Sequence, residues 1–246
     1  MNNINTLVLH RVVKGQIENF EDITFQTLVN ILKNESMPFY TIDSAFNKEN
    51  QAESSICLTF DDGFSSDVDI VLPELQGINA AATFFIVKDY LGKEGYMTKD
   101  QVIKLSNNNM QIGSHSLTHP NFLNISSKRK TEELVYSKKF LEDLTSKEVT
   151  TFSFPFGFFD KSSIDAVFLS GYKYCCISKH GITNSNFSII PRNSINGRMK
   201  MAKIYDSMYP SLIKRFIWSI EDFTKHSIKR YVPKFYPKIR DFISKL

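Results

Sequence analysis

Two adjacent aspartates follow an apolar run in the stretch ICLTFDDGFSSD. Ile56, Leu58 and Phe60 precede Asp61 and Asp62, so the pair stands where a buried strand leaves the core. Two carboxylates crowded at such a place do not both ionise unless a cation lies close to them. The sequence therefore predicts that a positively charged group belongs at this strand end.

Two histidines in the stretch GSHSLTHP offer further ligands to a cation. His115 and His119 are four residues apart, so on a helical turn both imidazoles would face one side. Together with one strand-end carboxylate they form a two-histidine, one-carboxylate set, which leaves metal coordination positions open for water and substrate. This composition suits a catalytic Zn²⁺.

The second aspartate then has a chemical role available. A carboxylate that lies beside a metal-bound water without binding the metal can take the proton of that water as it attacks a carbonyl group. The alternative is structural: Asp61 or Asp62 caps the turn before the next helix, and Gly63 supplies a positive φ. The two histidines favour the catalytic interpretation.

The elements around these residues alternate between strand and helix patterns. Runs rich in Val, Ile, Phe and Thr predict strands at 6–12, 55–60, 81–87, 110–115, 150–156 and 172–178. Helical spacing of apolar residues lies between them, as over 25–34 and 128–144. Such alternation predicts an α/β fold with a parallel sheet or an α/β barrel, where chemistry gathers at the carboxyl ends of the strands. His10, the aspartate pair, the histidine pair and the turn FPFG all follow predicted strands, so we expect them on one rim.

The composition is that of an ordinary globular protein, with 246 residues of which 42% are hydrophobic and 23% charged. The longest apolar stretch, AATFFIV, is far shorter than the roughly 20 residues that span a bilayer, and the first residues lack the pattern of a signal peptide, so we expect a cytoplasmic protein. Cys57, Cys175 and Cys176 form neither a disulfide framework nor a paired metal motif, and we expect them to be buried thiols.

The motifs LTFDDGFSSD, GSHSLTHP and FSFPFG, in this order, resemble the polysaccharide deacetylase family, the NodB-homology domain of carbohydrate esterase family four. The resemblance spans about residues 5–198 and implies a distorted (β/α) barrel and a metal-dependent hydrolase that removes acetyl groups from N-acetylated sugars. It implies Asp61 as the catalytic base and three metal ligands, Asp62, His115 and His119. It also implies that the backbone N–H of Phe156, after the proline of the third motif, helps to hold the oxyanion.

Two positions depart from the family pattern. Many members carry an arginine two residues before this proline, which pairs with the catalytic aspartate, whereas this chain has Ser153. Arg192 is either a replacement that reaches in from another strand end or a surface or structural arginine. The late histidine that serves many members as general acid is also missing. LVLHRV resembles the branch that deacetylates poly-N-acetylglucosamine exopolysaccharide, which carries this histidine near its amino terminus, so the resemblance implies His10 as the general acid; the alternative is a core histidine.

The carboxyl-terminal segment differs from the rest of the chain in charge. Residues 211–246 carry nine Lys and Arg against three Asp and Glu, and apolar residues at 212, 213, 216, 217 and 220 have helical spacing. We therefore expect a catalytic domain over 1–210 and a basic amphipathic extension over 211–246. The extension either packs on the domain or rests on an anionic membrane surface, which would be the inner face for a cytoplasmic protein. Nucleic acid is not an expected partner, because the chain has no aromatic and basic recognition motif.

Together these features predict a metal-dependent N-deacetylase of an N-acetylated sugar, polysaccharide or lipid-linked saccharide, with Zn²⁺ or another divalent transition metal as cofactor. Two alternatives remain open. One is the hydrolysis of another carbon–nitrogen bond, such as that of a cyclic amide or imide, on the same fold. The other is a non-catalytic carbohydrate-binding relic, an interpretation that the serine at position 153 supports and the retained aspartates and histidines oppose.

Overall fold

A computed structural model describes residues 3–33, 35–47 and 54–231, with side chains described up to Asp222. Its main feature is an eight-stranded parallel sheet in the order β10-β1-β4-β5-β6-β7-β8-β9. The strands are β1 Ile4–Leu9, β4 Ser55–Phe60, β5 Ala82–Ile86, β6 Gln111–Ser114, β7 Thr151–Ser153, β8 Tyr174–Ile177, β9 Ile189–Pro191 and β10 Asn193–Ser194. A small parallel pair joins β2 Val12–Val13 to β3 Ile23–Thr24.

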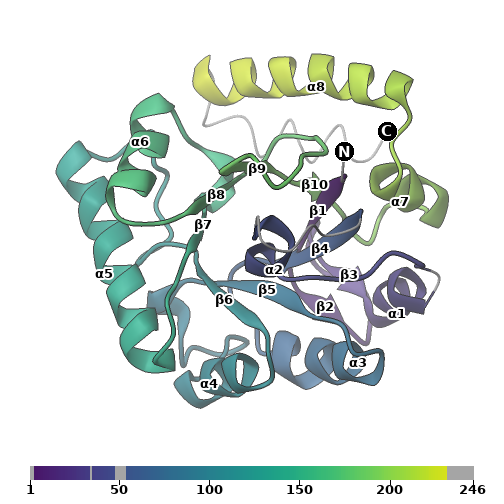
Figure 1. Ribbon diagram of the computed structural model, residues 1–246, viewed down its shortest axis with the longest axis horizontal. Helices are drawn as coiled ribbons and strands as arrows, with labels where there is room; N and C mark the ends of the chain where they lie inside the picture. The colour runs from purple at the N-terminus through teal and green to yellow at the C-terminus, as the bar shows by residue number, and fades with distance from the viewer. Residues whose placement is uncertain (1–2, 34, 48–53, 232–246) are drawn as a thin grey trace.

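Helices surround the ring of strands (Figure 1). They are α1 Phe25–Lys33, α2 Ile42–Phe46, α3 Leu72–Gly77, α4 Lys99–Asn107, α5 Ser127–Thr145, α6 Lys161–Leu169, α7 Met201–Met208 and α8 Leu212–Tyr231. Short turns of other helix types cover Asp67–Val71, Lys88–Tyr90 and Pro155–Gly157. The predicted (β/α) barrel architecture is confirmed. Within the described residues no helix has the length and hydropathy needed to cross a membrane.

The two edge strands of the sheet are consecutive in the chain. β9 pairs with β8 and β10 pairs with β1, and Arg192 alone separates them. The backbone N–H of Arg192 donates to the carbonyl oxygens of Ile177 and Lys179, while the side-chain amide of Asn193 donates to Asn5 Oδ1 on β1 at 2.7 Å. One short segment therefore bridges both edges and nearly closes the barrel, with Arg192 at the seam.

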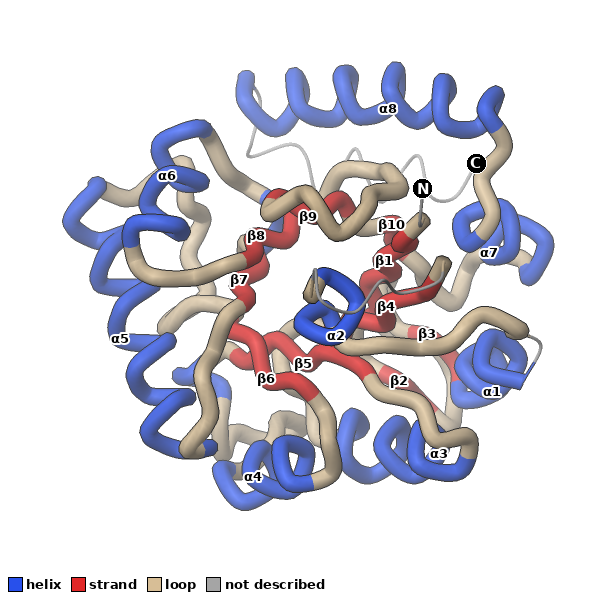
Figure 2. Tube along the Cα trace, viewed as in Figure 1, coloured by secondary structure: helices blue, strands red, loops and turns tan. Residues whose placement is uncertain are grey.

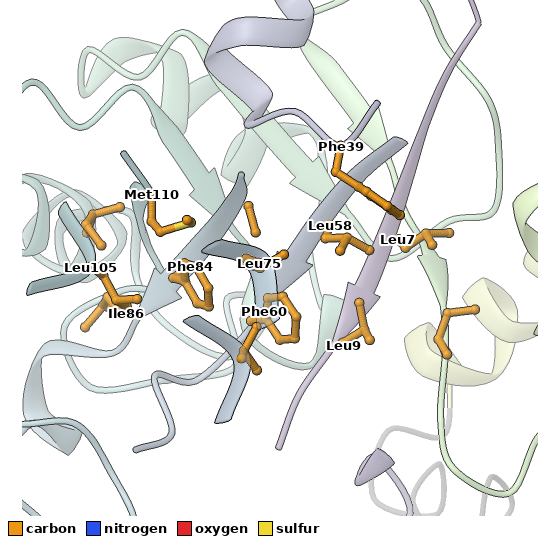
Figure 3. Close-up of a cluster of buried hydrophobic side chains, with 14 of the residues drawn as sticks. Leu7, Leu9, Phe39, Leu58, Phe60, Leu75, Phe84, Ile86, Leu105 and Met110 are labelled. Carbon is orange, nitrogen blue, oxygen red and sulfur yellow. The ribbon is translucent and has the colours of Figure 1, made fainter. Parts of the chain in front are cut away.

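Strand periodicity sorts the side chains into two cores. Side chains of alternate residues point outward, and Phe60 on β4 stacks on Phe84 of β5 at 5.1 Å beneath the helices (Figure 3). The intervening residues point inward, where Cys57, Phe85 and Cys176 belong to a second cluster closed by α2 at the amino end of the barrel. Asp61 follows in the inward register of Cys57, which aims its carboxylate into the opposite, carboxyl end.

The structure bears out most of the element predictions and adds to them. All six predicted strands are present, although the run at 150–156 is a strand only over Thr151–Ser153, because Pro155 starts a helical turn. The short strands β2, β3, β9 and β10 were not predicted, since two or three residues carry too little periodicity to be recognised. Cys57, Cys175 and Cys176 are free and buried, as predicted. Burial raises the pKa of Cys176 to about 12, so its thiol stays protonated.

Helix α8 confirms the predicted helical spacing. The apolar residues at 212, 213, 216, 217 and 220 are exposed on the outer side of the helix. The opposite side contacts the barrel through the buried Trp218. The part of the predicted extension at 232–246 lies outside the described residues.

Candidate active site at the carboxyl end of the barrel

The predicted site residues meet at one end of the barrel, where parallel strands end. His10 directly follows β1, Asp61 and Asp62 follow β4, and His115 follows β6. Arg192 reaches the same end from the seam between β9 and β10. Residues far apart in the sequence therefore converge because the strands are parallel and in register.

Asp61 forms a bidentate ion pair with Arg192 in the barrel interior. Arg192 donates from both terminal nitrogens to the two carboxylate oxygens, each at 2.7 Å, and both side chains are buried. Thr59 Oγ1 and Ser153 Oγ accept further hydrogen bonds from the guanidinium at 3.1 and 2.7 Å. The ring of Phe85 lies 5.3 Å beneath it. Of the two interpretations offered by the sequence, the structure shows the one in which Arg192 reaches Asp61.

This pair determines the protonation of Asp61. Burial by itself would raise the pKa of the carboxyl group, but the adjacent Arg192 charge outweighs burial and holds the pKa well below its usual range. Asp61 is consequently an ionised, buried hydrogen-bond acceptor at neutral pH.

Three side chains converge on one point beside this pair. Nε2 of His115 and Nε2 of His119 lie 3.4 and 3.2 Å from Asp62 Oδ1, and their ligand atoms all fall within 4.8 Å of one another. His115 Nδ1 lies 2.8 Å from the carbonyl oxygen of Ser153, so the neutral ring carries its proton on Nδ1 and turns an Nε2 lone pair toward Asp62. Burial lowers the pKa of His115 to about 4, which keeps this ring neutral.

A divalent metal fits this donor set. Asp62 Oδ1 is buried and accepts no hydrogen bond from the described residues, although it faces a ring nitrogen lone pair. The Nε2 lone pair of His115 and the carboxylate oxygen of Asp62, 3.4 Å apart with no proton between them, repel each other unless a cation lies beside them. Two imidazoles and one carboxylate are a ligand set that zinc and similar divalent metals accept, with coordination positions left open.

The segment that carries the histidines is not a helical turn, the condition under which the four-residue spacing would bring both rings to one side. It is a loop in which Ser116 and His119 have positive φ values of 73° and 61°, and this geometry brings the two rings to 5.0 Å. The buried Glu133 of α5 holds the loop: its carboxylate accepts from the N–H groups of Leu117 and Thr118, each at 2.8 Å, and from the Thr118 hydroxyl at 2.6 Å. Tertiary hydrogen bonds, rather than helix periodicity, set the ligand spacing.

His10 borders a cavity next to the converging ligands. The cavity has a volume of about 660 Å³, and His10, Asp62, Phe64 and Tyr96 are among its lining residues. His10 Nδ1 is buried and has no hydrogen-bond partner among the described residues, and its Nε2 lies 4.0 Å from Glu21. The ring is 17% exposed, so it is neither a surface histidine nor a core histidine with both nitrogens satisfied.

Phe156 lies over the site from the turn after β7. Its φ of 57° is unusual for a residue other than glycine, and its ring meets the His119 ring edge-on at 4.4 Å. A backbone held in this conformation at a site edge stores strain, which is a frequent property of functional positions.

Several residues of the site were missed in the sequence. In the sequence Ser153 stands out only because many family members have an arginine at this position. In the structure it contacts both Arg192 and His115. Glu133 gave no signal, because a glutamate in a helix pattern reads as surface charge. The stacked rings of Phe64 and Tyr96, 5.0 Å apart, also line the cavity, and no linear pattern joins them.

The sequence also matches a known protein family. The profile of the polysaccharide deacetylase family matches residues 48–175, more than half of the chain. The chain belongs to the polysaccharide deacetylase family. The match includes Asp61, Asp62, both histidines of the loop and Phe156, whereas His10 and Arg192 stand outside it.

Curated relatives extend the similarity. The poly-beta-1,6-N-acetyl-D-glucosamine N-deacetylase of Staphylococcus aureus is 23% identical over 236 residues, covering 87% of this chain and 78% of the relative. The peptidoglycan-N-acetylglucosamine deacetylase PgdA of Listeria monocytogenes is 33% identical over 113 residues, or 46% of this chain and 23% of the relative. YxkH of Bacillus subtilis is matched over 44% of its length, so the chain spans less than half of these last two relatives.

Solved structures share the fold of this polysaccharide deacetylase family member. The Streptococcus pyogenes deacetylase PplD, in complex with acetate, superposes with a TM-score of 0.75 at 20% identity, over 85% of this chain and 99% of that chain. IcaB from Ammonifex degensii gives 0.74 at 15% identity, over 85% and 97%. At these identities the likeness shows the fold.

Proposed function

We propose that this protein is a metal-dependent hydrolase that removes N-acetyl groups from an N-acetylated polysaccharide. The observation that carries the proposal is the buried Asp61–Arg192 pair beside the converging donors of Asp62, His115 and His119. Membership of the polysaccharide deacetylase family supports the reaction type, as does the name of the Staphylococcus aureus relative matched over most of this chain.

The roles of the residues follow from their positions. Asp62, His115 and His119 would hold the metal, which when bound supplies a Lewis acid for the acetamide carbonyl and for water. Asp61, kept ionised by Arg192, accepts the proton of the attacking water. We assign Arg192 to orienting and charging Asp61.

Two further residues complete the reaction. The backbone N–H of Phe156 would donate to the oxyanion, a role that the position of its turn against His119 supports. His10, at the cavity next to Asp62, would donate a proton to the departing amine. An imidazole at this place suits general acid catalysis, because its ring nitrogen can carry the proton that the amine takes up.

The substrate class follows from the cavity. Its volume of about 660 Å³ and its aromatic lining at Phe64 and Tyr96 suit a sugar ring and its neighbours in a chain. We place the catalytic domain in 1–210, because α7 is tied to β1 by hydrogen bonds from Asn5 to the carbonyl oxygens of Ser207 and Met208. Residues 211–246 would form the extension.

The test measures metal content and acetate release from β-1,4- and β-1,6-linked N-acetylglucosamine oligosaccharides. Asp61→Asn should lower turnover by about 10²–10⁴-fold. Asp69→Asn, the same change at an exposed position of the same segment, should leave it unchanged. His10→Ala should lower turnover without loss of metal.

The outcomes separate the alternatives. Bound metal with ring opening of cyclic amides or imides, and no release of acetate, would replace the deacetylase with an imide hydrolase. Bound metal with no hydrolysis of either class would indicate a relic, although Arg192 removes the argument that the serine at position 153 gave for one. A protein that contains no metal after purification and binds none when metal is added back would contradict the proposal.

A further inference from the structure

Among the described side chains of helix α8, Trp218 and Asp222 on one side of the helix attach it to the barrel. Trp218, 3% exposed, stacks on the His180 ring at 4.9 Å with an interplanar angle of 15°. Asp222 pairs with the same residue, accepting from the His180 backbone N–H at 2.7 Å and lying 2.8 Å from Nδ1. Since His180 follows β8 closely, the helix is fixed beside the carboxyl-end rim that carries the candidate active site.

The outward side of α8 is apolar and uncovered. Five large side chains are exposed there: Leu212 by 81%, Ile213 by 74%, Phe216 by 68%, Ile217 by 42% and Ile220 by 54%. At about 100° per residue these positions fill an arc of roughly 140°, centred opposite Trp218 and Asp222. Figure 2 shows α8 outside the ring of strands and helices. Such a continuous apolar strip marks an interaction surface.

Charge identifies the partner of this strip. Lys214 and Arg215 lie beyond its two edges, each by about 60° of helix rotation. Glu221 lies about 40° beyond the Ile217 edge, between this edge and Lys214, and Asp222 faces the barrel. The whole of 211–246 nevertheless carries nine Lys and Arg against three Asp and Glu. An apolar face on a segment of net positive charge matches the interface of an anionic bilayer, where acyl chains lie beneath negative headgroups.

We propose that α8, in its docked position, binds an anionic membrane surface through the strip formed by Leu212, Ile213, Phe216, Ile217 and Ile220. The helix lies in the plane of the interface and does not cross it. Trp218 stays packed on His180, so the barrel is held beside the bilayer through this contact. This binding does not depend on the proposed hydrolysis.

The test uses the full chain and sedimentation with phosphatidylcholine vesicles, with and without phosphatidylglycerol. The wild type should bind the anionic vesicles more strongly, and added salt should weaken binding because headgroup attraction is screened. The double variant Ile213→Glu with Phe216→Glu should lose about tenfold or more of the partition coefficient, since two charges replace buried apolar area. Leu169→Glu, the same type of change at an 89% exposed residue of α6, is the matched control and should bind as the wild type does.

Trp218 gives an independent readout, because it is the single tryptophan of the chain. Its emission should stay constant when vesicles are added, as its ring faces the barrel. A blue shift would mean that α8 leaves the barrel and inserts differently, which overturns the docked geometry. Acetate release from soluble oligosaccharides and circular dichroism should be equal in the double variant and the wild type, so a folding defect is detected separately.

Three other results would overturn the proposal. Absence of binding to anionic vesicles is one, and unchanged binding by the double variant is another. The third is a dimer of the wild type in sedimentation velocity together with a monomer of the double variant. The strip would then be covered by a second copy of this chain. Failure of the hydrolysis assay with vesicle binding intact would contradict only the proposed enzymatic function.

Discussion

At the scale of single residues, the buried pair of Asp61 and Arg192 is central to the proposed chemistry. An isolated carboxylate in the barrel interior would hold its proton, and a protonated Asp61 could not act as a base. The bidentate contact reverses that preference, and hydrogen bonds from Arg192 to Thr59 and Ser153 fix the geometry of the guanidinium. The pair lies at the barrel seam, so catalytic charge and barrel closure depend on one arginine.

Replacing this arginine tests the assignment. In Arg192→Met the pKa of Asp61 should rise, because burial then acts without the compensating charge. The acidic limb of the pH profile for acetate release should therefore move to higher pH, with turnover at neutral pH reduced by about 10²-fold. Arg192→Lys should partly restore the position of the acidic limb and the turnover at neutral pH. Arg215→Met on the exposed side of α8 should change neither quantity. A profile that keeps its acidic limb in Arg192→Met would exclude this role.

At the scale of elements, helix α5 positions the candidate metal ligands through Glu133. The glutamate reaches the backbone of the loop between His115 and His119, and Arg129 one turn earlier donates to it at 2.6 Å. Loop and helix come from separate parts of the chain. The positive φ values of Ser116 and His119 therefore persist because a tertiary contact over-determines them.

Glu133→Gln should weaken metal binding by about 10–100-fold, because an amide cannot accept on both sides of its head group. Titration calorimetry of the full chain with Zn²⁺ measures this effect without reference to activity. Glu132→Gln is the matched control, since Glu132 also pairs with Arg129 but does not contact the loop. Equal affinities for the two variants would show that Glu133 only stabilises the fold.

The turn Asp67–Val71 carries a second buried carboxyl group. Both oxygens of Asp67 lack a hydrogen-bond partner among the described residues, and burial raises its pKa well above the ordinary value, with Asp61 and Asp62 adding to the rise. The folded state thus keeps the proton that the unfolded state loses above a pH of about 4, so this group lowers stability as pH rises from there.

Asp67→Leu should raise the urea midpoint of unfolding, and the gain should grow between about pH 4 and about pH 8. The matched control is Asp69→Leu in the same turn, whose side chain is exposed and should show no pH-dependent gain. A gain in Asp67→Leu that is the same at both pH values would indicate better packing and no role for ionisation.

At the scale of the whole molecule, the site gathers residues from five strand ends. Holding three metal donors together costs free energy. A bound cation offsets this cost, and because it binds the folded state and not the unfolded state, it stabilises the fold. At free metal about 100 times Kd, binding adds about 2.7 kcal/mol to the free energy of unfolding. For a chain of this size the melting temperature should then rise by about 5–10 °C.

Scanning calorimetry of chelator-treated protein, with and without added Zn²⁺, measures this shift. His119→Ala should abolish it, and His180→Ala, which changes a histidine outside the donor set, should retain it. A shift of equal size in His119→Ala would place the metal elsewhere.

The sequence by itself determined six of the strands and which chemistry-bearing residues end them. Alternation along Ile56, Leu58 and Phe60 placed Asp61 at a strand end, and the histidine pair supplied metal-ligand types, because both signals are local in the chain. Only the tertiary structure decided that Arg192 reaches Asp61 from 131 residues away, that Glu133 shapes the loop of His115 and His119, and that the apolar strip of α8 faces outward. These outcomes depend on barrel closure and on which side of each helix meets the body, and no periodicity within one segment encodes either.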